Sequence, residues 1–191
     1  MGQPKALLDW HGVTAVEHAV AVAREGVARG PVCVVRAPGQ VLPELHSIVV
    51  DDPVAYGGPL AALHAGLRAL GGQAEVVFAC GVDTPLLVPA FVRAVCSSLA
   101  DGDDAVVPVV CGRAQPLLAA YRTTLTTVLG ELLEGGARGL RDIPAACVVR
   151  ELSEEDLLAH AELRAVDPGL RSAENANTPE EWAELLVRTS G

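Results

Sequence analysis

Residues 75–99 read EVVFACGVDTPLLVPAFVRAVCSSL, and this stretch decides the fold class. Residues 75–80 form a short apolar run, which is typical of a strand that is covered on both faces. A polar turn around Asp83 follows, and residues 88–99 are predicted to form a helix. A strand followed at once by a helix is the repeating unit of an α/β fold with a mostly parallel sheet.

The same alternation extends toward both ends of the chain. Strands are predicted over residues 31–35, 48–50, 105–110 and 146–149, and helices over residues 14–27, 59–70 and 124–133. Two further helices are predicted where capping boxes occur, at Ser153-Glu154-Glu155-Asp156 and at Thr178-Pro179-Glu180-Glu181. The sequence has no internal repeat, no low-complexity stretch and no long linker, so we expect one domain over residues 1–191.

Composition excludes several classes of protein. Hydrophobic residues make up 50 % of the 191-residue chain but aromatic residues only 3 %, so the core must consist mainly of Leu, Val and Ala. The formal net charge of −10 and the scarcity of stacking aromatics argue against a nucleic-acid partner. No apolar run reaches the roughly 18 residues of a membrane span, and no signal-peptide core is visible, so we expect no membrane insertion.

The five cysteines predict a reducing, cytoplasmic environment. They lie at positions 33, 80, 96, 111 and 147, without a CxxC pair, and four of them fall in apolar, strand-like runs. This pattern is typical of buried reduced thiols. A catalytic cysteine and a zinc site are the alternatives.

Two charged residues are the first candidates for chemistry, because ligands of α/β folds bind beyond the carboxyl ends of the strands. Lys5 is the only lysine in a chain whose other cations are all arginines. Asp83 follows an apolar strand directly, a position suited to holding Mg²⁺. The alternatives are an exposed terminal lysine and an aspartate that only begins a turn.

Other polar and glycine residues lie at predicted strand ends and loops. Asp51 and Asp52 could accept hydrogen bonds from a base or a sugar, and Gly58-Pro59 could let the backbone approach a ligand at a helix start. Asn175 and Asn177 directly precede the last predicted helix. The alternative is that these residues only form turns and helix caps.

Five segments together carry a more specific signal than any one of them. They are MGQPKALL (1–8), DD with GGPLAALHAGL (51–52 and 57–67), VDTPLL (82–87), RAQPLLAAYR (113–122) and NANTPEEW (175–182). In this order they resemble the nucleotidyltransferase family of molybdenum cofactor guanylyltransferase, from Met1 to about Leu186.

The resemblance implies a three-layer, Rossmann-like α/β fold and a defined reaction. Members of the family transfer GMP from GTP to the molybdopterin-type cofactor and release pyrophosphate, and Mg²⁺ bridges the phosphates. The resemblance also implies transient contact with molybdoenzymes or with other proteins of cofactor assembly.

The resemblance also gives roles to the candidate residues. Lys5 would bind the triphosphate, Asp83 would hold Mg²⁺, and Asp52 or Asp51 would recognise the base. The nucleotide side then consists of Lys5, Asp51, Asp52, Gly58, Pro59 and Asp83, and the acceptor side of Asn175 and Asn177.

Two alternatives to this reaction remain open. A related enzyme could act on another substrate pair, as molybdopterin cytidylyltransferase or phospholactate guanylyltransferase does. A catalytically silent nucleotide-binding remnant would keep the same motifs. The segment RAQPLLAAYR looks more like the guanylyltransferase pattern.

The sequence departs from the family's pattern at its start. The family begins with an apolar strand and a loop of the form Leu-Ala-Gly-Gly-x-Ser-x-Arg, whereas this chain starts at the Met that follows them. A misplaced start site, a decayed gene copy and a short binding or regulatory form are the three explanations, and we favour the first. Without the strand we expect two open sheet edges and a marginally stable fold.

Overall fold

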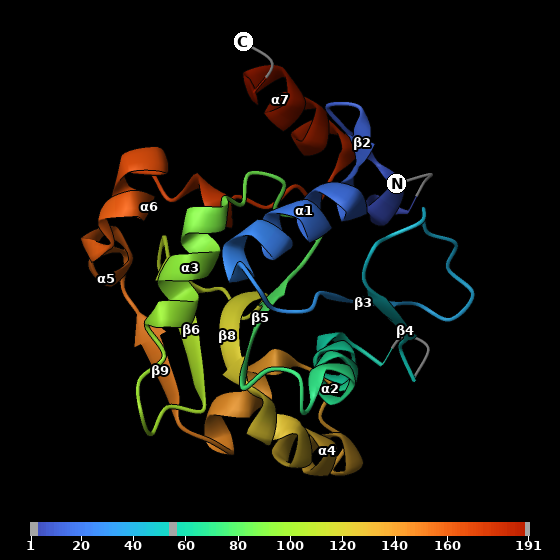
Figure 1. Ribbon diagram of the computed structural model, residues 1–191, viewed down its shortest axis with the longest axis vertical. Coiled ribbons are helices and arrows are strands. Elements are labelled where there is room, and N and C mark those ends of the chain that lie inside the picture. Colours follow the sequence, from blue (N-terminus) through green and yellow to red (C-terminus); the bar gives the residue numbers. More distant parts are fainter. Residues whose placement is uncertain (1–3, 54–56, 190–191) are drawn as a thin grey trace.

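Strands and helices alternate along most of the chain in the computed structural model, which describes residues 4–53 and 57–189 (Figure 1). The helices are α1 (Ala15–Val27), α2 (Pro59–Leu70), α3 (Pro89–Ser97), α4 (Thr126–Glu134), α5 (Glu154–Ala159), α6 (Ala161–Val166) and α7 (Pro179–Thr189). The strands are β1 (Asp9–Trp10), β2 (Val13–Thr14), β3 (Cys33–Arg36), β4 (Ile48–Asp51), β5 (Val76–Cys80), β6 (Ala105–Val110), β7 (Arg113–Ala114), β8 (Leu118–Arg122) and β9 (Val149–Leu152). Short 3₁₀ turns are η1 (Lys5–Leu7), η2 (Thr123–Leu125), η3 (Leu140–Ala145) and η4 (Arg171–Ala173).

The largest sheet has the order β5-β8-β6-β7, with β9 on β6. Its β5–β8, β8–β6 and β6–β7 pairs are antiparallel, and only β6–β9 is parallel. The expectation of a mostly parallel sheet is therefore wrong for this sheet. Separate from it, β3 and β4 form a parallel pair, and β1 and β2 form an antiparallel one.

A chain reversal after β6 causes this difference. Cys111 and Gly112 both have positive φ, and the chain turns back there through β7 into β8. β8 then lies antiparallel between β5 and β6, with Val76 opposite Arg122 and Cys80 opposite Leu118. Residues 118–122 belong to one of the five sequence segments, and no strand was predicted there.

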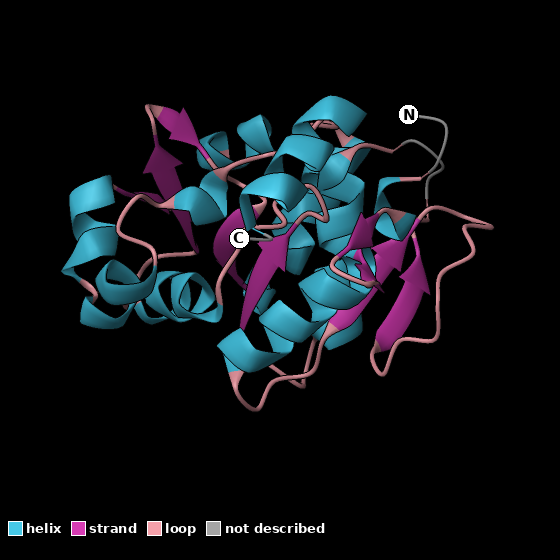
Figure 2. Cartoon of the chain, turned by 90° about the horizontal axis from the view of Figure 1, so that it is seen from above, coloured by secondary structure: helices cyan, strands magenta, loops and turns pink. Residues whose placement is uncertain are grey.

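Helices cover both faces of this sheet (Figure 2). Successive β8 residues face opposite layers. Leu118 and Ala120 pack in one core with Phe91 and Val92 of α3 and with α5 and α6. Ala119 and Tyr121 pack in a second core against α2 and α4. The core is built mainly from Leu, Val and Ala, as the composition predicts.

Local signals placed most elements well. The α2 helix begins and ends at the predicted residues, and the predicted capping boxes form at Ser153 with Asp156 and at Thr178 with Glu181. The last predicted strand begins at Val149, three residues later than expected, after the 3₁₀ turn η3. The α6 helix was not predicted.

Two expectations from composition concern the membrane and the cysteines. Within the described residues, no helix combines the length and the apolar character needed to cross a bilayer. All five cysteines are free thiols, but Cys111 is exposed in the turn after β6, so it is not one of the buried thiols that the sequence predicts.

Gly26 on α1 lies directly against Val92 on α3. A Cβ at residue 26 would lie 2.5 Å from the Val92 Cβ. Although alanine is favoured over glycine in a helix by about 1 kcal/mol, we expect Gly26→Ala to lower the free energy of unfolding by about 1–3 kcal/mol through overpacking. Urea denaturation measures this loss.

Gly130→Ala on α4 is the matched control, because its new Cβ would make only an ordinary 3.6 Å contact with His64. We expect no loss of stability in this control. An unchanged unfolding midpoint in Gly26→Ala would contradict the close packing of α1 on α3.

Candidate functional site

Three of the predicted site residues meet at one place. Lys5 begins η1, Asp83 follows β5, and Asn177 precedes α7. The Lys5 Nζ lies 3.1 Å from the Asn177 Oδ1 and 3.8 Å from the Asp83 Oδ2. The Lys5 and Asp83 side chains are each 31 % exposed, so both remain accessible to a ligand. One ammonium group thus contacts both a candidate metal ligand and a candidate acceptor-side amide.

Backbone and capping contacts hold the Asn177 segment against Asp83. The Ala176 N–H donates to the Asp83 carbonyl oxygen at 2.8 Å. The Glu181 carboxylate accepts from the Asn177 N–H at 2.6 Å and from the Thr178 N–H at 3.1 Å. These contacts explain how a residue 172 positions away along the chain reaches Lys5.

The helix α7 that carries Glu181 is itself anchored. Trp182 is buried, and its Nε1–H donates to the Asp9 carbonyl oxygen at 2.8 Å. Its ring packs edge-on against Trp10, with 5.3 Å between the ring centroids. Neither Glu181 nor Trp182 was among the predicted site residues. The capping box was the one signal that could have found them.

The two acidic candidates for base recognition lie at the carboxyl end of β4. Arg36 and Asp51 are register partners in the parallel β3–β4 pair, and the Arg36 Nε donates to the Asp51 Oδ1 at 2.7 Å. The Asp52 N–H donates to the Arg36 carbonyl oxygen at 2.7 Å. The Asp51 carboxylate is therefore paired with Arg36 and not with the Lys5 group.

Gly58 and Pro59 start α2, as predicted, but the structure gives Gly58 a packing role. Gly58 has φ 83°, and a Cβ there would lie 2.6 Å from the Arg138 carbonyl oxygen. The Leu60 N–H also approaches this oxygen, at 3.4 Å. Pro59 occupies the first turn, where its missing N–H costs nothing. Close packing alone therefore requires glycine at position 58.

Asn175 is the least constrained of the predicted residues. It is exposed, two residues before Asn177. The amide that contacts Lys5 belongs to Asn177. Of the two asparagines, only Asn177 therefore has a structural link to the other candidate site residues.

The single carboxylate of Asp83 fits a hard divalent cation whose remaining ligands come from substrate phosphates and water. Among residues 4–53 and 57–189, no group of three or more His, Cys, Asp or Glu residues could by itself hold a metal ion. Mg²⁺ commonly binds through one or two carboxylates and completes its shell with substrate phosphates and water. Burial, aided by the Asp83 charge, raises the pKa of the nearby Cys80 thiol to about 11.

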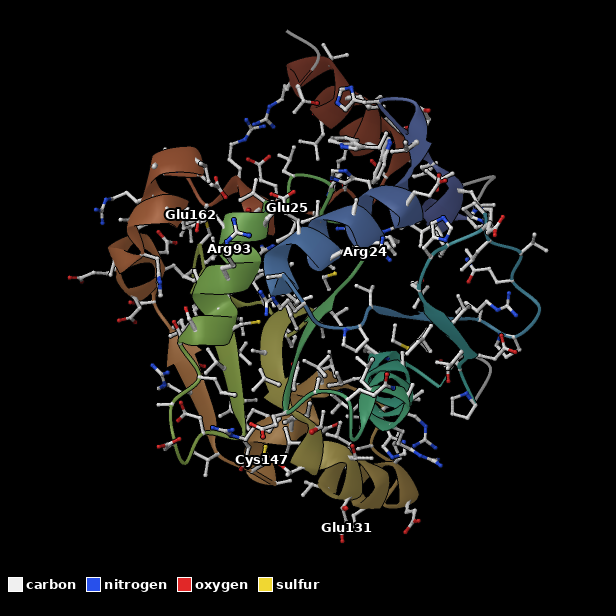
Figure 3. The ribbon with its side chains drawn as sticks, viewed as in Figure 1. Arg24, Glu25, Arg93, Glu131, Cys147 and Glu162 are labelled. Carbon is white, nitrogen blue, oxygen red and sulfur yellow. The ribbon has the colours of Figure 1, made fainter. Side chains whose placement is uncertain are left out.

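A separate cleft of about 640 Å³ lies between α1, α3 and α6. Arg93 lies in it and joins the Glu25 carbonyl oxygen to the Glu162 carboxylate (Figure 3). None of the predicted site residues lines this cleft. Its one prominent charge pair bridges helices, so we assign it a structural role.

Comparison with known proteins identifies the family. The profile of the MobA-like NTP transferase domain matches residues 1–153. The chain belongs to this family. The resemblance seen in the five sequence segments is thereby confirmed, and so is the α/β nucleotidyltransferase fold class of the MobA-like domain.

Two relatives of this MobA-like chain carry the same name. It is 34 % identical over 175 residues to a probable molybdenum cofactor guanylyltransferase of Mycobacterium avium (strain 104), covering 87 % of this chain and 88 % of that protein. A protein of the same name from Bacillus cytotoxicus is 30 % identical over 195 residues, covering 97 % of this chain and 89 % of its own length.

Solved structures share the fold of the MobA-like chain. The molybdopterin-guanine dinucleotide biosynthesis protein A of Archaeoglobus fulgidus has a TM-score of 0.74 and 20 % identity, covering 99 % of this chain and 92 % of that one. Rv0371C of Mycobacterium tuberculosis, solved in complex with manganese, has a TM-score of 0.64 and 18 % identity, covering 96 % and 91 %.

Proposed function

We propose that this chain transfers GMP from GTP to the terminal phosphate of a molybdopterin-type molybdenum cofactor and releases pyrophosphate. The observation that carries the proposal is the contact of Lys5 with both Asp83 and Asn177. This contact places a cation, a metal-binding carboxylate and a hydrogen-bonding amide together in a chain whose relatives are named molybdenum cofactor guanylyltransferases.

The reaction needs charge neutralisation more than covalent chemistry. An oxygen of the acceptor phosphate forms a bond to the α-phosphorus, the bond from that phosphorus to the α,β-bridging oxygen breaks, and pyrophosphate leaves with those electrons. Lys5 would neutralise charge on the triphosphate, and Asp83 would hold Mg²⁺. When bound, Mg²⁺ would supply further neutralisation of the phosphates. Manganese in the Rv0371C structure supports a divalent cation in this fold.

The acceptor binds on the side of Asn177, with Asn175 two residues before it. Glu181 keeps the Asn177 backbone in place, so that the amide side chain points at Lys5. We infer that Lys5 stands between the triphosphate and the acceptor phosphate, because its ammonium group contacts residues assigned to each side.

The direct test is product formation. Purified chain, GTP labelled at the α-phosphate, molybdopterin cofactor and Mg²⁺ should yield a labelled dinucleotide and pyrophosphate. A labelled product only from CTP would instead indicate a cytidylyltransferase, and a product only with phospholactate would indicate the other guanylyltransferase. Nucleotide binding without any product would indicate a silent remnant.

Asp52 is the residue we assign to base recognition, as the resemblance to the family implies, with Asp51 as the alternative. A carboxylate accepts hydrogen bonds from the guanine N–H groups, whereas adenine presents the opposite pattern there. We expect Asp52→Asn to lower the ratio of kcat/KM for GTP over ATP by about tenfold to a hundredfold. Steady-state kinetics with both nucleotides measure the ratio.

Asp51→Asn is the matched comparison on the neighbouring residue. A fall in the GTP over ATP ratio in Asp51→Asn, together with an unchanged ratio in Asp52→Asn, would transfer the role to Asp51.

The setting of the reaction follows from the same assignment. We place the protein in the cytoplasm, because its five cysteines are free thiols. GTP and the molybdopterin cofactor are its small-molecule partners, Mg²⁺ is its metal, and molybdoenzymes or other cofactor-assembly proteins receive its product.

A further inference from the structure

His18 in the first turns of α1 contacts the turn that carries Asp83. The His18 Nε2 lies 2.9 Å from the Pro85 carbonyl oxygen, although the two residues are 67 positions apart in the chain. A carbonyl oxygen only accepts hydrogen bonds, so the His18 Nε2 must carry a proton and donate it. Pro85 is buried, and a buried carbonyl oxygen needs a donor. His18 supplies that donor from a side chain.

Three consecutive carbonyl oxygens of this turn, those of residues 83–85, accept hydrogen bonds from three different parts of the chain. The first accepts from the Ala176 N–H at 2.8 Å, the second from the Leu87 N–H at 3.1 Å, and the third from His18. The first two donors are backbone groups, which every residue type except proline provides. Only the third bond depends on which side chain is present.

Apolar packing fixes the ends of this turn but not the orientation of the peptide groups between them. Val82 and Leu86, on either side of the turn, pack in one cluster with Trp10. The Trp10 ring also lies beside His18, with 5.8 Å between the ring centroids. Burial of apolar surface has no directional preference, whereas a hydrogen bond does. The direction in which Asp83 leaves the backbone therefore depends on the hydrogen bonds of the turn.

The contact of His18 with the turn acts through a hydrogen bond and not through a charge. Burial lowers the pKa of His18, so the ring is uncharged at neutral pH. Its Nε2–H is directed at the Pro85 carbonyl oxygen, so this group is engaged with the backbone of the turn. A neutral donor also adds no repulsion against a divalent cation at Asp83.

We propose that His18 is a positioning residue, whose hydrogen bond to the Pro85 carbonyl oxygen directs the Asp83 carboxylate toward the divalent cation. This inference rests on the proposed function, because it takes Asp83 as the metal-binding residue. His18 lies outside the five sequence segments and was not among the predicted site residues. Without its bond the turn can shift and carry the carboxylate with it, so the first consequence is weaker metal binding.

Two substitutions of His18 separate the hydrogen bond from the ring. His18→Phe keeps a ring without a donor, whereas the amide nitrogen of His18→Gln can reach the same carbonyl oxygen. Binding of Mn²⁺ in the presence of GTP is measured by electron paramagnetic resonance of the free ion. We expect the Kd for Mn²⁺ to rise by about fivefold to tenfold in His18→Phe, the effect of one hydrogen bond, and by less than about twofold in His18→Gln.

The kinetics of guanylyl transfer should show the same division. In His18→Phe we expect the half-saturating Mg²⁺ concentration to rise by about fivefold to tenfold, and kcat at saturating Mg²⁺ to fall by less than about threefold. A residue that only stabilised the fold would lower Tm without changing the dependence on Mg²⁺.

His160→Phe is the matched control. The His160 Nε2 also makes a side-chain hydrogen bond, 3.1 Å from the Ser98 Oγ, and His160 lines the separate cleft between α1, α3 and α6. We expect this control to leave the Kd for Mn²⁺ unchanged, whatever stability it loses.

Asp83→Asn, measured beside these variants, distinguishes the possible failures. Weaker Mn²⁺ binding in Asp83→Asn but not in His18→Phe would overturn the role of His18 and leave Asp83 as the metal ligand. Unchanged Mn²⁺ binding in Asp83→Asn would overturn both assignments.

Two further measurements need neither metal nor substrate. Hydrogen exchange at the Ala176 amide, which donates to the same turn, should be at least about fivefold faster in His18→Phe than in His160→Phe, and equal rates would overturn the proposal. Nitrogen NMR of the unsubstituted chain should find the neutral His18 ring protonated on Nε2. A proton on Nδ1 instead would overturn the proposal without any substitution, because the Pro85 carbonyl oxygen would then have no donor from His18.

Discussion

Replacing Asp83 with asparagine is expected to lower guanylyl transfer by about a hundredfold or more. The substitution keeps the shape of the side chain but removes the charge that holds Mg²⁺, and no cluster of other acidic, histidine or cysteine ligands in the described residues can replace it. Initial rates measured over a range of Mg²⁺ concentrations give the size of the loss.

The loss should not come from unfolding. Asp83 is about one third exposed and its ion pair with Lys5 is long, so the pair contributes little to stability. Asp101→Asn, in an exposed turn before β6, is the matched control and should retain full activity. Near-normal turnover of Asp83→Asn at saturating Mg²⁺ would remove Asp83 from the metal site.

Replacing Lys5 with alanine is expected to weaken GTP binding by about tenfold to a hundredfold. A hydrogen bond to a charged group contributes about 1.5–3 kcal/mol, which corresponds to a change of that size in Kd. Lys5 is the only lysine of the chain, and in the structure its ammonium group faces Asp83 and Asn177. Calorimetry of GTP binding in the presence of Mg²⁺ measures the effect.

Lys5→Arg separates the charge from the shape of the side chain. Arginine keeps the positive charge, so part of the GTP affinity should return, and the remaining affinity should weaken as the salt concentration rises. An unchanged Kd in Lys5→Ala would show that Lys5 serves only to hold Asp83 and Asn177 together.

The local structure was predictable because its signals lie within a few residues of one another. The apolar spacing from Leu60 to Leu70, with Pro59 in the first turn, was enough to place α2. The reciprocal contacts of Thr178 and Glu181 depend on a spacing of three residues that the sequence displays directly. β8 escaped prediction because its place in the sheet depends on antiparallel pairing with β5, which lies far earlier in the chain.

The candidate site was predictable in its residue types but not in its assembly. The sequence supplied no means of choosing Asn177 over Asn175 as the contact of Lys5, because both lie in the same short loop. Nor could it show that Arg36 pairs with Asp51, since that contact depends on the parallel register of β3 and β4.

The sequence by itself determined the family, the alternation of strands and helices, the helix caps and the candidate residues for binding phosphate and metal. Only the tertiary structure decided which strands pair, which amide meets Lys5, and that His18 meets the Pro85 carbonyl oxygen. The physical reason is the distance along the chain over which each interaction acts. Periodicity and capping are interactions between near neighbours, whereas strand pairing and the closing of the site depend on burying surfaces that lie far apart along the chain.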